Sequence, residues 1–190
     1  MILRATLAAA LLATPAAADW AVDGAASSIG FVSIKNGDVA ESHMFRAVSG
    51  GVSGDRAEVE IGLGSVETYI DIRNERMRKM LFDLEKFPIA AVSAQIDLAA
   101  LEALEPGART QLDTEVLVTA NGAEAPYDAR LNVTRLTADR VAVSAAEPVL
   151  LHVEDLGYGP GIEALREVAG LDAISPVVPV TFDLVFDLVE

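Results

Sequence analysis

Apolar and polar residues alternate along most of this chain, and the alternation constrains its fold more than any other feature. In the segment 178–188 every even-numbered position is apolar, while Thr181, Asp183 and Asp187 occupy odd-numbered positions. Successive side chains of a strand point to opposite faces, so one face of this segment is expected to be buried. The pattern predicts a β-strand whose inward face carries Val178, Val180, Phe182, Leu184, Phe186 and Leu188.

Seven other segments show a similar alternation or a β-forming composition, namely 27–34, 43–52, 57–66, 90–98, 112–119, 129–134 and 139–145. Turn-forming pairs such as Asn36-Gly37, Pro106-Gly107 and Asn121-Gly122 separate several of them. About eight strands at this spacing predict an all-β antiparallel sandwich or barrel. Alternation leaves both open, and the difference matters because a small barrel can hold a ligand whereas a sandwich interior is filled.

The segment 73–88, which reads RNERMRKMLFDLEKFP, replaces the β-pattern with a helical one. Its apolar residues recur at intervals of three and four and predict a helical stripe made of Met77, Met80, Leu81 and Leu84. One interpretation is a helix that covers an end of the sheet with these side chains in the core. A second interpretation adds that Met adapts to irregular apolar ligands, and that Arg73, Arg76 and Lys79 attract a ligand's headgroup. A second short helix is predicted at 160–170.

The first eighteen residues have the pattern of a secretory signal peptide. Arg4 precedes an apolar run at 5–13, and small residues lead up to Ala18. The run is too short for a membrane span, which needs about 20 residues. We therefore expect cleavage after Ala18, a periplasmic or secreted protein, and one domain that covers residues 19–190.

Composition excludes several functional classes. A formal net charge of −15 argues against nucleic acid as a partner, because phosphates require Lys and Arg. The chain has no Cys, and its two histidines, His43 and His152, lie in no metal-binding or catalytic motif. Ser65 lacks the surrounding pattern of a hydrolase nucleophile. We expect no catalytic residues, no metal and no cofactor, and hence a protein that is not an enzyme.

Three stretches resemble the YceI-like family in order and spacing. They are DWAVDGAASSIGFVSIKNGDVAESHMFRAVSGGV at 19–52, SVETYIDIRNERMRKMLFDLEKFPIAAVSAQI at 65–96, and PVTFDLVF at 179–186. The resemblance implies an eight-stranded antiparallel barrel similar to that of lipocalins, here with two short helices. It also implies that an elongated apolar channel holds a polyisoprenoid-type lipid or an isoprenoid quinone, for transport or sequestration and without turnover.

Site residues follow when this resemblance is carried over position by position. Ile29, Phe31 and Phe45 are expected near the mouth of the channel, and Arg73 and Glu75 at the start of the helix. Together with the inward positions of the predicted strands, the expected lining is Ile29, Phe31, Phe45, Ile61, Leu63, Met77, Leu81, Phe82, Val116, Val118, Phe182 and Phe186. The residues expected at the rim, near the headgroup, are Arg73, Arg76 and Lys79.

Other functions remain open beside a lipid carrier. One is an enzyme that acts on a lipid within the same barrel, which an organised carboxylate or His pair in the cavity would support. Another is a subunit that presents a quinone to a membrane redox system. A structural outer-membrane barrel is disfavoured, because aromatic residues make up only 5% of the chain. The expected partner is the lipid or quinone, and transient contact with a membrane or a membrane redox protein, or a homodimer, is left open.

Overall fold

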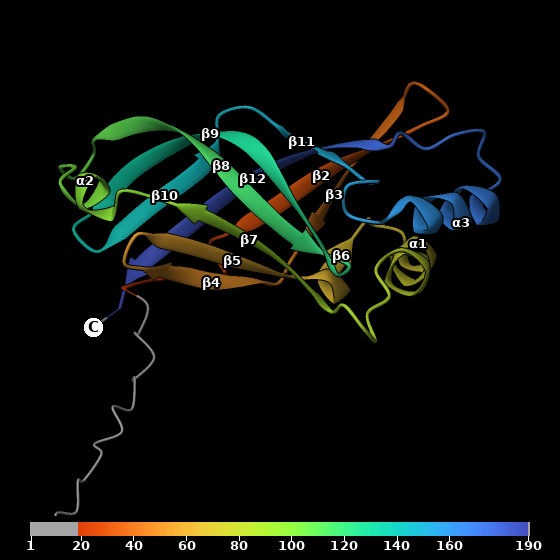
Figure 1. Ribbon diagram of the computed structural model, residues 1–190, viewed down its shortest axis with the longest axis horizontal. Coiled ribbons are helices and arrows are strands. Elements are labelled where there is room, and N and C mark those ends of the chain that lie inside the picture. The colour runs from red at the N-terminus through yellow and green to blue at the C-terminus, as the bar shows by residue number, and fades with distance from the viewer. Residues whose placement is uncertain (1–18, 190) are drawn as a thin grey trace, which may run out of the picture.

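The computed structural model describes residues 19–189, and the predicted signal peptide lies outside this range. Antiparallel strands dominate the fold, and short helices gather at its two ends (Figure 1). The strands are β1 (Trp20–Val22), β2 (Ser28–Lys35), β3 (Val39–Phe45), β4 (Val48–Ser53), β5 (Arg56–Gly62), β6 (Val66–Glu67), β7 (Ile89–Gln95), β8 (Arg109–Ala120), β9 (Ala123–Thr137), β10 (Arg140–Ala145), β11 (Val149–His152) and β12 (Val177–Leu188). The helices are α1 (Asp71–Arg76), α2 (Leu98–Glu102) and α3 (Gly159–Ala169), with a 3-10 turn η1 (Leu63–Ser65) and a π-helical turn η2 (Met77–Leu81).

The sheet closes on itself and forms a barrel. Four of its eight strands are interrupted, so that β1 and β2, β3 and β4, β5 and β6, and β10 and β11 each act as one strand. Each strand pairs antiparallel with its neighbour along the chain, and β12 pairs with β10 on one side and with β1 and β2 on the other. The register pairs Val180 with Phe31 and Leu188 with Trp20. Because the last strand pairs with the first, the structure confirms the predicted eight-stranded antiparallel barrel over a sandwich.

One interruption shows how local chemistry shapes a barrel strand. Arg46 and Ala47 lie between β3 and β4, so their backbone N–H groups form no hydrogen bond with a neighbouring strand. The Ser65 hydroxyl accepts hydrogen bonds from both groups, at 3.0 and 2.9 Å, and donates one to the Gly62 carbonyl at 2.6 Å. Ser65 thus gives both N–H groups a partner in place of the ladder bonds that they lose at this exposed break. Its hydroxyl therefore has a structural task.

The predicted turns and the second helix are found where expected. Asn121 and Gly122 both have positive φ, 52° and 76°, which is the requirement of a tight type I′ hairpin. Gly170 ends α3 in the left-handed conformation, with φ of 63°. All eight predicted strand segments overlap observed strands.

Three expectations need correction. The helical segment ends at Leu81 and does not continue to residue 88, because Asp83 adopts a positive φ of 47° that no helix can include. A third helix, α2, was not expected; it is only five residues long, and Asp97 caps it by accepting a hydrogen bond from the Ala100 N–H at 3.0 Å. The short strands β1 and β11 were also missed.

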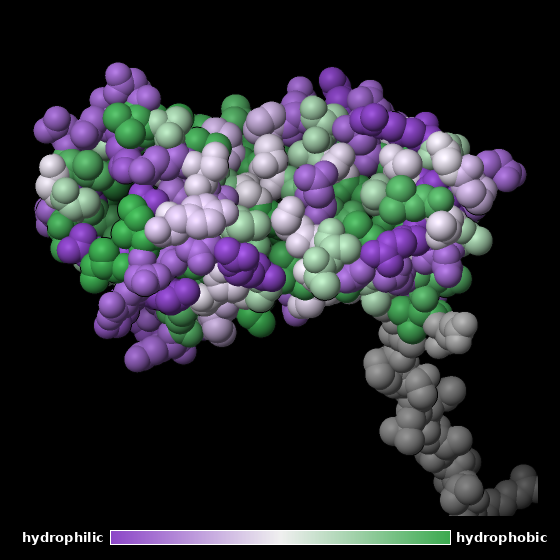
Figure 2. All heavy atoms as spheres, turned by 180° about the vertical axis from the view of Figure 1, so that it is seen from behind, coloured by the Kyte–Doolittle hydropathy of each residue, from purple (hydrophilic) through white to green (hydrophobic). Residues whose placement is uncertain are grey.

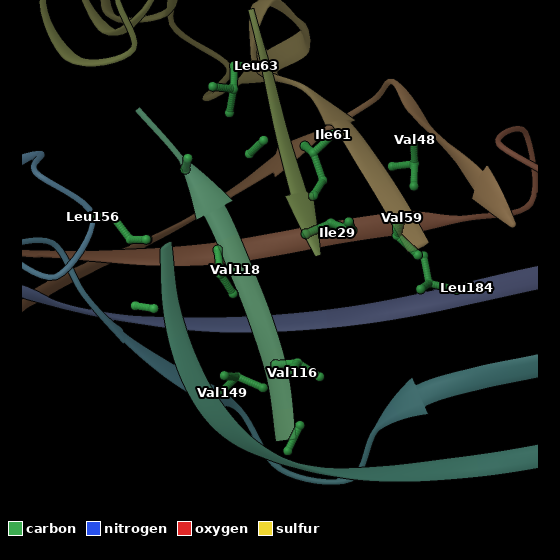
Figure 3. Packing of buried hydrophobic residues seen from close by; sticks show 14 of the residues in the cluster. Ile29, Val48, Val59, Ile61, Leu63, Val116, Val118, Val149, Leu156 and Leu184 are labelled. Carbon is green, nitrogen blue, oxygen red and sulfur yellow. The ribbon is translucent and has the colours of Figure 1, made fainter. Parts of the chain in front are cut away.

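The apolar interior follows from the alternation. Inward side chains from strands on opposite sides of the barrel converge, as Ile61 of β5, Val116 of β8 and Leu184 of β12 illustrate (Figure 3). On the face drawn in Figure 2, hydrophilic residues are mixed with hydrophobic ones. At the right of Figure 1, α1 and α3 lie side by side over one end of the barrel, whereas α2 lies at the other end.

Candidate functional site: an apolar cavity in the barrel

The barrel contains a cavity of about 610 Å³. This volume lies within the range of roughly 300–1,000 Å³ that small-molecule sites occupy. All eight barrel strands contribute to the lining, which is mainly aliphatic and aromatic. The cavity is thus suited to an apolar ligand.

The structure brings the predicted lining residues together. Each of Ile29, Phe31, Phe45, Ile61, Leu63, Met77, Leu81, Phe82, Val116, Val118, Phe182 and Phe186 lines this cavity. On β12 the even-numbered positions from Val178 to Phe186 face it, as the alternation requires. Leu188 is the exception, because it lies at the end of the strand and is 45% exposed. Contact of these residues with a ligand stays a prediction.

The predicted helical stripe is only half right. Met77 and Leu81 line the cavity, but Met80 and Leu84 do not; Phe82, which lies outside the stripe and was placed in the lining by the resemblance, does. The cause is the π-helical turn, in which the Phe82 N–H donates to the Met77 carbonyl at 3.0 Å, five residues back. The wider turn rotates the residues that follow, so that Leu81 and Phe82 both reach the interior. Such a turn is not visible in a pattern of three- and four-residue intervals.

One end of the cavity is open. Of the large exposed hydrophobic side chains among residues 19–189, Ile70, Ile72 and Val168 also line the cavity. They are 45%, 54% and 43% exposed, and they belong to the start of α1 and the end of α3. We call these three residues the collar. Their position places the opening, the mouth, between α1 and α3.

The opposite end is covered by α2 and by Trp20. The Trp20 side chain is 3% exposed and donates from Nε1 to Glu102 Oε1 at 3.2 Å. The Arg135 guanidinium carbon lies 4.9 Å from the centroid of the Trp20 ring. Arg135 Nε donates to the Thr137 carbonyl at 2.8 Å, and its Nη2 donates to the Ala138 carbonyl. These contacts close this end.

A charged cluster lies beside the mouth. Glu41 accepts from Arg73 Nη1 and from Lys35 Nζ, both at 2.5 Å. The Lys35 ammonium, and then the Arg73 guanidinium, hold the pKa of Glu41 below its usual value against the effect of partial burial. Arg73 Nη2 also donates to the Thr68 carbonyl at 2.6 Å. Arg73 lines the cavity as predicted, but its charge is already compensated by Glu41.

The two other rim predictions have different outcomes. Arg76 lines the cavity and makes no ion pair or side-chain hydrogen bond within the part of the chain that the structure describes. Lys79 does not line the cavity: it points to solvent and pairs with Glu75 at 2.6 Å. Lys79 is therefore not a lining residue, and its expected role at the rim stays a prediction. Glu75, expected beside Arg73, is likewise exposed.

His43 lies in the cavity wall and is 4% exposed. Its Nε2 is 2.8 Å from the Ser33 hydroxyl, and its ring centroid is 5.1 Å from that of Phe31. Burial, and next the nearby Arg73 charge, lower the pKa of His43 to about 4, so the ring is neutral at neutral pH. His43 Nδ1 is buried and has no hydrogen-bond partner among the described residues.

Rings from four elements form a continuous row in the cavity. From Phe31 to Phe45, Phe45 to Phe82, and Phe82 to Tyr158 the centroids are 5.3, 5.8 and 5.9 Å apart. Burial raises the pKa of Tyr158 to about 12, and its hydroxyl also lacks a partner within residues 19–189. The row links the strand wall to the loop before α3. Tyr158 was not predicted from the sequence.

Asn74 is a second residue that the sequence did not reveal. It is 4% exposed, and its Oδ1 accepts from the Thr68 N–H at 2.8 Å and from the Thr68 hydroxyl at 2.6 Å. Its Nδ2 donates to Glu67 Oε1 at 3.0 Å. Asn is a poor helix former, so its place inside the predicted helix was the available signal. These bonds fasten α1 to β6 beside the mouth.

The geometry is suited to binding. No group of three or more His, Asp or Glu side chains within residues 19–189 could hold a metal ion. Over the same residues, no helix is long and apolar enough to cross a membrane. What the site offers is an apolar volume with charged side chains at both ends, Arg73 and Arg76 by the mouth and Glu102 and Arg135 at the closed end.

Known proteins share this architecture. A family model described as the YceI-like domain matches residues 20–186. A solved polyisoprenoid-binding domain from Saccharophagus degradans, implicated in plant cell wall breakdown, is 37% identical, with a TM-score of 0.88 over 91% of this chain and 100% of that chain. No curated protein gives a significant match to the sequence.

Two more distant structures show the fold alone. BcnA of Burkholderia cenocepacia is 17% identical, with a TM-score of 0.67 over 86% of this chain and 98% of that chain. A mutant CJ YCEI protein with a monobromobimane guest is 11% identical, with a TM-score of 0.58 over 78% of this chain and 85% of that chain.

Proposed function

This chain belongs to the YceI-like domain family, and from that premise we propose that it is an exported protein that holds a polyisoprenoid-type lipid or an isoprenoid quinone in its barrel, without turnover. The observation that carries the proposal is the apolar cavity of about 610 Å³, lined from all eight strands and open at one end. The 37% identical neighbour is described as a polyisoprenoid-binding domain, which supports the same ligand class here.

The affinity comes mainly from the ligand's chain. Removing apolar surface from water contributes about 25 cal/mol per Å², so each further isoprene unit that enters the cavity strengthens binding. The polar groups at the mouth add a smaller amount, because charges near water are screened. Arg76 is the cation available to a headgroup, whereas Arg73 is occupied by Glu41. A quinone carbonyl or a terminal phosphate could each accept from Arg76.

Export rests on the sequence of residues 1–18. We propose that this segment directs the chain to the periplasm or beyond and is removed after Ala18. N-terminal sequencing of the protein from the periplasmic fraction is expected to give Asp19. A chain that retains Met1 in the membrane fraction would contradict this part of the proposal.

The binding proposal is tested on protein purified from its own host. Native mass spectrometry with lipid extraction is expected to find an isoprenoid bound to the wild type. Met77 is 7% exposed and lines the cavity, so Met77→Asp is expected to abolish lipid retention, whereas the volume-conserving Met77→Leu retains it. Circular dichroism establishes that both variants are folded. A wild type without lipid, or a folded Met77→Asp with full retention, would refute the proposal.

A second candidate function is an enzyme that acts on a lipid in the same cavity. The observation in its favour is the 2.8 Å contact between the Ser33 hydroxyl and His43 Nε2, since both residues line the cavity. A pKa of about 4 makes His43 a weak base at neutral pH, and no carboxylate orients its Nδ1 among the described residues. Hydrolysis of isoprenyl or fatty-acyl esters that Ser33→Ala abolishes would establish this alternative.

A further inference from the structure

The collar has two properties that seldom coincide. Ile70, Ile72 and Val168 are in contact with solvent and also line the interior of the cavity. Tyr69, which precedes them in the chain, is 72% exposed. Exposed apolar groups that cluster together mark sites of interaction, since leaving them in water has a cost. Any ligand that enters through the mouth passes over these side chains.

The charge of the same segment differs from that of the whole chain. Residues 69–80 contain four basic residues, Arg73, Arg76, Arg78 and Lys79, and two acidic ones, Asp71 and Glu75, which gives a formal charge of +2. The complete chain carries −15. On the other side of the mouth, residues 159–172 contain Glu163, Glu167 and Asp172 against Arg166, a formal charge of −2. Near a negatively charged surface the barrel body and the α3 side are therefore repelled, while the α1 side of the mouth is attracted. This asymmetry turns the α1 side of the mouth, with Tyr69, Ile70 and Ile72, toward such a surface.

We propose that the mouth docks on an anionic phospholipid bilayer, with Tyr69, Ile70 and Ile72 in the interface, so that a lipid moves between bilayer and cavity without crossing water. The inference rests on the proposed function for the identity of the transferred lipid, but docking itself can be measured without any ligand. Aromatic and aliphatic side chains with basic neighbours are the composition of a surface-bound membrane anchor.

A second copy of the chain is a less suitable occupant. A stable interface between two proteins buries about 800 Å² on each partner. The collar and Tyr69 are only four side chains, too few to bury such an area. A bilayer needs neither a large complementary surface nor a specific register.

The fold supports the mouth from beneath. The start of α3 lies so close to η2 that a Cβ on Gly161 would be 2.8 Å from the Met80 carbonyl oxygen. On the far side of α3, Asn36 of the β2–β3 turn holds the chain through its Oδ1, which accepts from the Asp172 N–H at 2.9 Å. The docking face is therefore presented on a fixed frame.

The experiment compares two pairs of exposed side chains at opposite ends of the barrel. Tyr69→Ser/Ile72→Ser removes apolar groups at the mouth. Leu136→Ser/Leu188→Ser is the matched control, because these residues are 44% and 45% exposed and lie near the closed end beside Arg135 and Trp20. Each delipidated protein is sedimented with vesicles of phosphatidylcholine alone, or of equal parts of phosphatidylglycerol and phosphatidylcholine.

Wild type and control are expected to sediment with the anionic vesicles, and the mouth variant to bind about tenfold less. A fluorescent isoprenoid is then transferred from the protein to acceptor vesicles. If the protein docks on the vesicles, the transfer rate of the wild type rises with vesicle concentration. No sedimentation of wild type, or equal losses in both variants, would overturn the inference. A concentration-dependent dimer that the mouth variant abolishes would also overturn it, by assigning the collar to a second copy. Absence of lipid from the purified wild type would instead refute the proposed function.

Discussion

The two ends of the barrel are built on different principles. At the closed end Trp20 is 3% exposed and is held by Glu102 and Arg135. At the mouth, Ile70 and Ile72 of the collar remain about half exposed. The same set of strands thus ends in a sealed layer on one side and in an entrance on the other. The difference shows that one end is closed by packed side chains, while the other leaves apolar side chains in contact with both solvent and cavity.

The polar atoms confirm the contrast. Four buried polar side-chain atoms have no partner in the described residues. Three of them belong to His43, Arg73 and Tyr158, which line the cavity on the side of α1 and α3. Each such atom costs free energy that a compact core would avoid. Their placement near the entrance is consistent with groups that a ligand or water would satisfy. At the closed end Arg135 Nη1 is the corresponding exception.

The largest expected effect comes from breaking the closed end. Trp20→Ala removes a buried ring that covers the cavity, and it is expected to lower the free energy of unfolding by about 3–5 kcal/mol. Urea denaturation measures this change. Trp20→Phe, which keeps most of the buried surface and loses only the bond to Glu102, is expected to cost much less. A Trp20→Ala protein as stable as wild type would show that α2 alone seals this end.

The mouth is expected to respond to acid. His43 has a pKa of about 4 in the folded protein and about 6.5 when unfolded, so the unfolded state binds the extra proton first. Stability contributed by neutral His43 is complete above pH 6.5 and is lost as the pH falls toward 4, by about 3 kcal/mol. Glu41, whose pKa is lowered, adds a loss only at the acidic limit of this range.

Urea denaturation at intervals between pH 7 and 4.5 tests the assignment. His43→Gln removes the titrating group, and its stability is expected to be nearly independent of pH over this interval. An unchanged slope in the variant would assign the acid sensitivity to other groups. Trp20→Phe is the control from the closed end and should keep the wild-type slope.

A smaller effect is expected from detaching α1. Asn74→Ala leaves the buried Thr68 N–H without its partner, which is expected to cost about 1–3 kcal/mol. Glu75→Ala, one residue away and exposed, is expected to change stability by less than about 0.5 kcal/mol. Amide exchange should accelerate in α1 and η2 of the Asn74 variant while β8 and β9 stay protected. Uniform acceleration would mean that mouth and barrel unfold as one unit.

The sequence predicted the barrel wall better than its two ends. Alternation on β12 and β8 identifies inward residues because the strand period is two whatever the partner strand is. The seal cannot be found in this way, since Trp20 and Glu102 are 82 residues apart and meet only after the barrel closes. At the mouth, the helical periodicity placed Met80 and Leu84 in the stripe beside Met77 and Leu81, but after the π-helical turn neither lines the cavity.

The polar site was the least predictable part. Arg73, Arg76 and Lys79 were all placed at the rim from their charge, yet only Arg73 and Arg76 line the cavity, whereas Lys79 faces solvent. Only the structure shows that Glu41 occupies Arg73, because the two residues come from distant elements. A cluster of basic residues in the sequence therefore predicts a charged rim, but it does not show which of these residues forms an ion pair.

The smallest expected effect distinguishes those cations. Arg76 lines the cavity without an ion pair in residues 19–189, whereas Lys79 does not line it and pairs with Glu75. Arg76→Ala is expected to weaken binding of an isoprenyl phosphate about two- to fivefold, as a charge contact of about 0.5–1 kcal/mol requires, and to leave an isoprenyl alcohol of equal chain length nearly unaffected. Lys79→Ala should change neither affinity. Competition binding with the two ligands measures both ratios. Equal losses for phosphate and alcohol would mean that Arg76 contributes through its aliphatic chain, and that the mouth admits headgroups without selecting their charge.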